Sequence, residues 1–146
     1  MEKNDLRDNL IDVFTRFYNM ETMADLMDFC QGELRVLHYL TINQNINDCI
    51  PSKISTALHV TRGRITSALN SLRKKGFVTM EICENDRRKI LVRLTQSGRD
   101  HLQNRKCQAE AFIDHFIINI GETKAHQFME ILDQTAKNML KERAIQ

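Results

Sequence analysis

The sequence predicts a mainly α-helical chain of the α+β class, in which a single β-hairpin interrupts a series of helices. Apolar residues recur at helical spacing over most of the 146 residues. Residues 77–94 instead alternate apolar and polar side chains around a charged turn, which is typical of a hairpin. Thr61 and Thr95 are favourable helix N-caps. Gly76 and Gly121 follow periodic segments, where glycine commonly ends a helix.

Helices are expected on both sides of the hairpin. The first covers about residues 4–20, and residues 22–29 fit either a short helix or a loop. A helix at about residues 31–42 is apolar on nearly all sides, so we expect it to be central. After the hairpin, two long helices are expected over about residues 96–119 and 122–143.

Two shorter helices directly precede the hairpin. Pro51 suits the first position of a helix over about residues 51–58. Thr61 begins another helix, which ends near Lys75. Two helices joined by a turn as short as His59-Val60 form a helix-turn-helix, and a hairpin that follows it is a wing. The predicted fold is therefore a winged helix-turn-helix with flanking helices at both ends.

The chain length suits one compact subunit built from three segments. Residues 1–29 supply an N-terminal helix and a connection, residues 30–99 the winged lobe, and residues 100–146 two C-terminal helices. The outer segments carry apolar stripes that one small winged lobe cannot fully cover. These segments are therefore expected to be dimerisation helices.

The composition argues against several classes of protein. No apolar run approaches the roughly 18 residues that cross a bilayer, and no apolar signal core follows the charged N-terminus. We therefore expect a cytoplasmic protein with no membrane partner. The four cysteines form no CxxC pair, so a zinc ribbon has no support. No catalytic motif is present, and neither an enzymatic activity nor a cofactor is expected.

Positive charge is concentrated in the middle of the chain. Residues 51–99 hold 11 Lys/Arg and three Asp/Glu, a net charge of +8, whereas the rest of the chain has a net charge of −6. A basic segment between acidic ends indicates a polyanionic partner such as DNA. A solvated charged face is the plainer alternative.

The helix that begins at Thr61 has a polar outward face. On a helical wheel, Ile65, Leu69 and Leu72 fall on the inward side together with Ala68. Short polar side chains on the outward side let a helix lie deep in a major groove, and arginine pairs with guanine edges. Glycine is costly in a helix, which close approach of the backbone to a phosphate would explain. The predicted DNA contacts are Thr61, Arg62, Gly63, Arg64, Thr66, Ser67, Asn70 and Lys74.

The predicted wing has a charged turn at residues 84–88. Asp86 lies two residues before Arg88, so its carboxylate can brace the guanidinium group. Arg88 is the candidate for insertion into a narrow minor groove, where the negative potential is strong. Arg87 and Lys89 are expected at the flanking phosphates, which position a protein without specifying sequence.

Residues 30–102 resemble the MarR family of winged-helix transcription regulators. Residues 60–78 resemble the recognition helix of that family and the strand that follows it. The family's wing pattern, D-x-R followed by L-T-x-x-G, is present as Asp86, Arg88, Leu94, Thr95 and Gly98. The resemblance implies a homodimer, held by the N-terminal and C-terminal helices, that binds a palindromic operator in double-stranded DNA. Repression is the expected mode of action.

The resemblance also implies a response to a ligand, to cysteine oxidation or to a metal, and the sequence leaves these alternatives open. Cys30 is the redox candidate, because it lies just before a helix start where the dipole favours a thiolate, although Asp28 and Glu33 oppose this effect. A metal site is conceivable from His38, His101, Cys30 and Glu33, but we expect no bound metal. A small aromatic or amphipathic ligand is preferred, held by Phe14, Phe17, Tyr18, Met23, Met27 and Tyr39.

A winged domain that binds only other proteins is the alternative from a different class. Arg62, Arg64 and Arg88 argue against it, because a protein interface does not require three cations on the helix and wing that face DNA in this fold.

Overall fold

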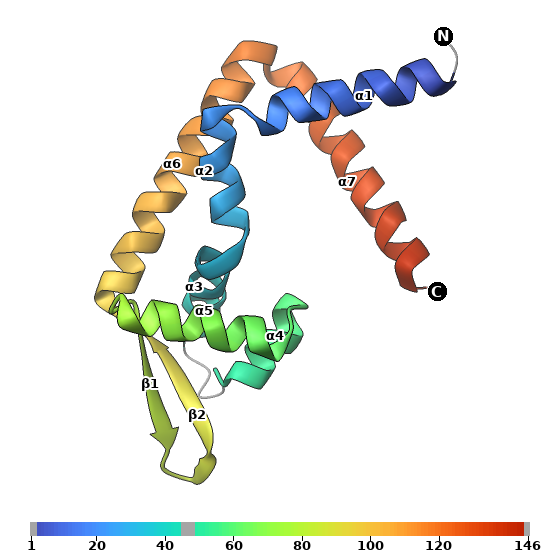
Figure 1. Cartoon of the computed structure of the whole chain (residues 1–146). Coiled ribbons are helices and arrows are strands. Elements are labelled where there is room, and N and C mark those ends of the chain that lie inside the picture. The colour runs from blue at the N-terminus through green and yellow to red at the C-terminus, as the bar shows by residue number, and fades with distance from the viewer. Residues whose placement is uncertain (1–2, 45–48, 145–146) are drawn as a thin grey trace. The chain divides into compact units, whose positions relative to one another are not determined.

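The computed structural model describes residues 3–44 and 49–144. These residues form seven helices and one antiparallel hairpin (Figure 1), which confirms the predicted fold class. None of the described helices is long and apolar enough to cross a membrane. In chain order the elements are α1 (Lys3–Tyr18), α2 (Glu21–Cys30), α3 (Gly32–Asn43), α4 (Pro51–Leu58), α5 (Arg62–Lys74), β1 (Val78–Cys83), β2 (Asp86–Leu94), α6 (Gln96–Ile120) and α7 (Glu122–Ala144).

The bounds of the predicted helices agree with the structure to within two residues. The segment that fitted either a helix or a loop is helical and forms α2. The predicted turn at residues 84–88 is wrong, because β2 already begins at Asp86. Cys83 pairs with Asp86 in the hairpin, so the turn between the strands consists of Glu84 and Asn85 alone.

The chain divides into two compact units, the first ending at Ala109 and the second beginning at Glu110 within α6. The first unit contains α1 to α5, the hairpin and the start of α6. The second contains the end of α6 and the whole of α7, which Gly121 separates with a φ of +82°. The division into three segments expected from the sequence stays a prediction.

Helix α3 lies at the centre of the apolar core of the first unit, as its sequence predicted. Leu37 and Leu40 of α3 are 0% and 1% exposed. The same core contains Ile54 of α4, Leu69 of α5 and Val92 of β2. The helix-turn-helix and the base of the hairpin are thus packed on one core, which positions the elements discussed below.

The base of the hairpin is fastened to the end of α5 by Thr95 and Gly98. The Thr95 hydroxyl donates a hydrogen bond to the Gly76 carbonyl (2.7 Å) and accepts one from the Gly98 N–H (3.0 Å). The Thr95 backbone N–H donates to the Phe77 carbonyl (3.1 Å). A Cβ atom on residue 98 would overlap that same carbonyl oxygen. Thr95 therefore caps α6 and holds the wing to α5, and glycine at residue 98 gives the room for this contact. We call these four residues the wing clamp.

A second fastening joins the end of α5 to the start of α3. The Lys75 ammonium lies 2.6 Å from the Glu33 carboxylate. Burial raises the pKa of Glu33, but hydrogen bonds from Lys75 and Ser71 and the charges of Lys75 and His101 outweigh it, so the pKa is lower than usual. The folded protein therefore favours the ionised carboxylate.

Substitution Gly98→Ala tests the wing clamp. It should lower the free energy of unfolding by about 2–3 kcal/mol, because the added methyl group overlaps a backbone carbonyl in a packed region. Gly63→Ala is the matched control, since a Cβ at residue 63 meets no atom within 4 Å and should leave stability equal or slightly raised. Chemical denaturation measures both variants. A Gly98→Ala protein as stable as the wild type would contradict the role of the clamp.

Substitution Glu33→Gln should remove a contribution to stability that depends on pH in a defined direction. The pKa of Glu33 is lowered on folding, so its stabilising contribution is present above the ordinary carboxyl pKa and is lost as the pH falls through the folded-state pKa. We expect Glu33→Gln to unfold more readily than wild type at neutral pH, and the difference to vanish in acid. Chemical denaturation at several pH values checks this. The control is the substitution Glu84→Gln, which changes an exposed carboxylate in the turn of the hairpin. A difference that is constant with pH would exclude the ion pair as its cause.

Candidate nucleic-acid interface

Helix α5 has one buried apolar face and one exposed polar face. Ile65, Leu69 and Leu72 are at most 2% exposed and anchor the helix in the core, as the helical wheel predicted. Asn70 is half-buried, so it is less accessible than the wheel predicted. The other residues predicted to contact DNA from α5 and its cap are all exposed: Thr61, Arg62, Gly63, Arg64, Thr66, Ser67 and Lys74.

The turn between α4 and α5 sets the direction in which α5 leaves the core. His59 has a φ of +53° and ends α4 in the left-handed conformation. The buried Ser55 hydroxyl donates a hydrogen bond to the Val60 carbonyl (2.6 Å), and the Val60 N–H donates to the Ser55 carbonyl (3.1 Å). Thr61 then accepts the Arg64 N–H (3.4 Å), which confirms the predicted cap. The sequence analysis did not identify Ser55 as part of this turn. The signal that could have identified it is a small polar residue on the inward face of a predicted helix.

Gly63 leaves the backbone open near the start of α5. A Cβ atom there would meet no atom within 4 Å, and the residue does not have a positive φ. The fold therefore does not require glycine at this position. Glycine also lowers helix stability by about 1 kcal/mol relative to alanine, so its presence here has no structural benefit. The open backbone is compatible with the predicted close approach to a phosphate, which stays a prediction.

The hairpin projects from the helical lobe as a narrow two-stranded ribbon (Figure 1). The strands pair regularly up to Ile82 and Ile90, and the next pair is Cys83 with Asp86. Residues 87–89 therefore have no partner on β1 and form a bulge in β2. Bulges bend a strand and redirect its side chains. The three bulged residues are all basic and exposed: Arg87, Arg88 and Lys89.

Asp86 braces the backbone of this bulge. Its Oδ1 accepts a hydrogen bond from the Arg88 backbone N–H (3.1 Å), and its Oδ2 lies 3.8 Å from the Lys89 Nζ. The predicted brace between the carboxylate and the Arg88 guanidinium is therefore wrong. The short Asp side chain closes on the backbone two residues ahead, as Asx turns do. Within the described residues the Arg88 guanidinium has no ion pair, so it is available to a partner.

Positive charge on the lobe is largely uncompensated. Four cations of α5 have no ion pair among the residues that the structure describes: Arg62, Arg64, Arg73 and Lys74. On the hairpin, Arg93 lies 3.8 Å from Glu81. Unpaired cations on one lobe make a surface that attracts a polyanion over a distance of about 10 Å at ordinary salt concentrations.

The residues predicted to hold a ligand are distributed over α1, α2 and α3. Phe14 and Tyr18 of α1 are 65% and 68% exposed, and Met23 of α2 is buried. None of the six lines the pocket that the structure forms between α6 and α7. The remaining three are half-buried: Phe17, Met27 and Tyr39. Their role as a ligand site stays a prediction.

The structure changes the argument for Cys30 as a redox site. Cys30 is the last residue of α2, while α3 begins at Gly32. Cys30 therefore lies at the carboxyl end of one helix as well as before the start of the next. Cys107 is exposed like Cys30, whereas Cys49 is buried, and burial raises the pKa of the Cys49 thiol.

Two residues of the alternative metal site have other partners. His101 stacks on the Phe77 ring at 4.4 Å between centroids, and Glu33 binds Lys75. Within residues 3–44 and 49–144, no three His, Cys, Asp or Glu side chains are grouped so as to hold a metal ion.

Comparisons with known proteins match this architecture. Residues 33–113 match the family described as winged helix DNA-binding domain. The chain is 24% identical over 103 residues to an uncharacterized HTH-type transcriptional regulator, YdgJ, of Bacillus subtilis. That alignment covers 70% of this chain and 63% of YdgJ, so it spans less than two thirds of that relative.

Two solved structures illustrate the similarity in fold. Streptococcus pneumoniae FabT, solved in complex with DNA, has a TM-score of 0.65 and 21% identity, over 96% of this chain and 99% of FabT. A MarR transcriptional regulator from Methanosarcina mazei has a TM-score of 0.61 and 18% identity, over 94% of this chain and 98% of that protein.

The family match includes α3 to β2 and therefore the exposed face of α5 and the basic bulge of the wing. It extends over more than half of the 146 residues. The chain thus belongs to the winged helix DNA-binding domain family, and its fold is that of the MarR-type transcriptional regulators.

Proposed function

We propose that this protein is a sequence-specific transcription regulator that represses by binding a palindromic operator as a homodimer. In this proposal α5 enters the major groove, and Arg88 enters the adjoining minor groove. Arg87 and Lys89 bind the flanking phosphates, and Asp86 holds the backbone of the bulge in place.

The observation that best supports this proposal is the combination of an exposed polar face on α5 with a bulge of three cations on the wing. The wing clamp fastens these two elements to each other at Thr95. DNA binding in this fold requires both elements in a fixed relation, because grooves and phosphates repeat at fixed spacings. A module that binds only proteins has no comparable need for unpaired cations on both.

Exposed apolar residues on α1 and, separately, on α7 support the homodimer. On α1, Leu10 is 47% and Val13 is 50% exposed. On α7, Leu132 is 48% and Leu140 is 67% exposed. Amphipathic helices seldom leave such a stripe in water, and obligate dimers bury stripes of this kind between subunits.

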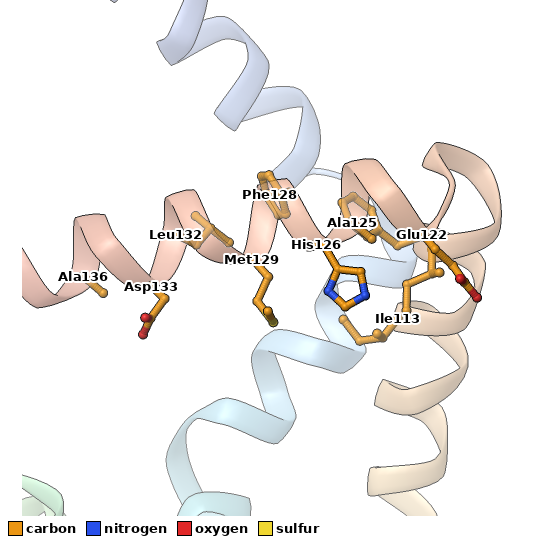
Figure 2. Close-up of a pocket in the computed structure, with 11 residues that line it drawn as sticks. Ile113, Glu122, Ala125, His126, Phe128, Met129, Leu132, Asp133 and Ala136 are labelled. Atoms are coloured by element: carbon orange, nitrogen blue, oxygen red, sulfur yellow. The ribbon is translucent and has the colours of Figure 1, made fainter.

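The second unit also contains an open apolar pocket of about 800 Å³ between the end of α6 and α7. Figure 2 shows Ile113 of α6 and Phe128, Met129 and Leu132 of α7 around it. Phe116 and Phe128 pack at 5.3 Å between ring centroids, which fixes one side of the pocket. We propose that helices of the second subunit fill it.

We further propose that a small aromatic or amphipathic ligand releases the operator by shifting the population towards a conformation with poorly spaced recognition helices. A redox trigger has less support, because α2 ends at Cys30.

Substitution Arg88→Ala tests the wing contact with DNA. Selection of random duplexes by the wild-type protein supplies the operator, and fluorescence anisotropy measures affinity. The variant should lose about 1–3 kcal/mol of binding free energy, since the Arg88 side chain that it lacks is exposed and has no ion pair among the described residues. Lys124→Ala removes an exposed cation from α7 and should bind as wild type. Equal affinity of the Arg88→Ala protein would exclude the wing contact, and enrichment of no duplex would favour the protein-binding alternative.

Substitution Leu132→Asp tests the homodimer. It places a charge on the apolar pocket of α7 and should convert a dimer into monomers in sedimentation velocity, because an unpaired buried charge is costly. Gln134→Asp changes an exposed polar neighbour on the same helix and should leave the dimer intact. A monomeric wild-type protein at micromolar concentration would contradict the proposal.

A further inference from the structure

One face of the hairpin remains apolar beyond the body of the lobe. Side chains alternate between the two faces of a strand, so alternate residues of β1 share a face with their partners on β2. At the base of this face, Val78 and Val92 are each 2% exposed. Near the tip, Ile82 pairs directly with Ile90, and these side chains are 67% and 41% exposed. An isoleucine pair therefore stands in water at the outer end of the wing.

The opposite face of the hairpin is mostly polar, although Leu91, the partner of Glu81, is apolar and half-buried. Thr79 is exposed, and the Glu81 carboxylate lies 3.8 Å from the Arg93 guanidinium. Strand propensity does not account for the isoleucine pair, because threonine is also β-branched and suits an exposed strand position. The two faces differ in chemistry up to the point where the basic bulge begins.

We propose that Ile82 and Ile90 form an apolar contact surface for the deoxyribose wall of the minor groove that the wing tip enters. This inference rests on the proposed DNA binding and deepens it. The Ile82–Ile90 pair is the last regular pair before the bulge, and Ile90 follows Lys89 directly along β2. Sugar carbons are the apolar part of the DNA backbone, and proteins that bind the minor groove frequently use apolar side chains in the contact.

Charge complementarity favours DNA over a second protein as the occupant of this surface. Arg87 and Arg88 beside the pair are exposed and have no ion pair among the described residues. A second copy of the chain that docked wing to wing would bring the same positive charges to this surface and would be repelled. A polyanion with apolar sugar edges satisfies both the cations and the isoleucines.

The test is the double substitution Ile82→Thr and Ile90→Thr, measured by anisotropy on the duplex selected by the wild-type protein. Affinity should fall about fivefold, because apolar area is lost from the contact. The slope of log affinity against log salt should remain unchanged, since no phosphate contact is removed, whereas Arg87→Ala should reduce that slope by about one. The conservative Ile82→Val and Ile90→Val protein should show a smaller loss.

Two controls separate this contact from a structural role. Ile42→Thr changes an isoleucine of α3 that is 67% exposed and should bind DNA as wild type. Thermal unfolding should show the valine variant to be as stable as wild type, so its weaker binding cannot come from an unfolded hairpin. Wild-type affinity in the double threonine variant would overturn the inference while leaving the proposed function intact. Failure of the wild-type protein to select any duplex would overturn the proposed function itself.

Discussion

The hydrogen bonds of Thr95 are the interaction on which the arrangement of the lobe depends. One threonine side chain binds the Gly76 carbonyl after α5 and caps α6 through the Gly98 N–H, while its backbone binds Phe77 at the start of the wing. Three elements meet there, and the absence of a Cβ on residue 98 lets α6 approach the Phe77 carbonyl. The spacing L-T-x-x-G is therefore a geometric requirement: threonine caps the helix, and glycine three residues later gives the room for the approach.

The surface formed by α5 and the wing departs from what stability alone would favour. Gly63 occupies a position where any small residue would fit, and the basic bulge interrupts an otherwise regular ladder. Arg62 and Arg64 lie on one face without acidic partners among the described residues. Sequences depart from the local preferences of helices and strands mainly where a protein contacts a partner, because selection there acts on the contact and not only on the fold. The apolar core beneath this surface, together with the wing clamp and the Lys75–Glu33 ion pair, offsets the stability that is lost at these positions.

The helices, the central position of α3 and the caps at Thr61 and Thr95 could be predicted from the sequence, because each follows from local periodicity or a single residue type. The hydrogen bond of Asp86 could not be predicted, because its carboxylate reaches the backbone N–H of Arg88 as easily as the Arg88 guanidinium. The bulge depends on the register of two strands, which no local pattern specifies. The partial burial of Asn70 likewise depends on neighbouring elements.

The clamp also limits how a signal could release DNA. Helix α6 is continuous from Gln96 to Ile120 and passes from the first unit into the second. Its first turn is held by Thr95, the residue that also holds the wing and the end of α5. The Lys75–Glu33 ion pair adds a second tie between α5 and α3. A ligand that displaces the start of α6 or α3 would therefore move α5 and the wing together as one body. Under the proposed mechanism, the trigger changes the distance between two intact lobes of a dimer, and the contacts within each lobe persist.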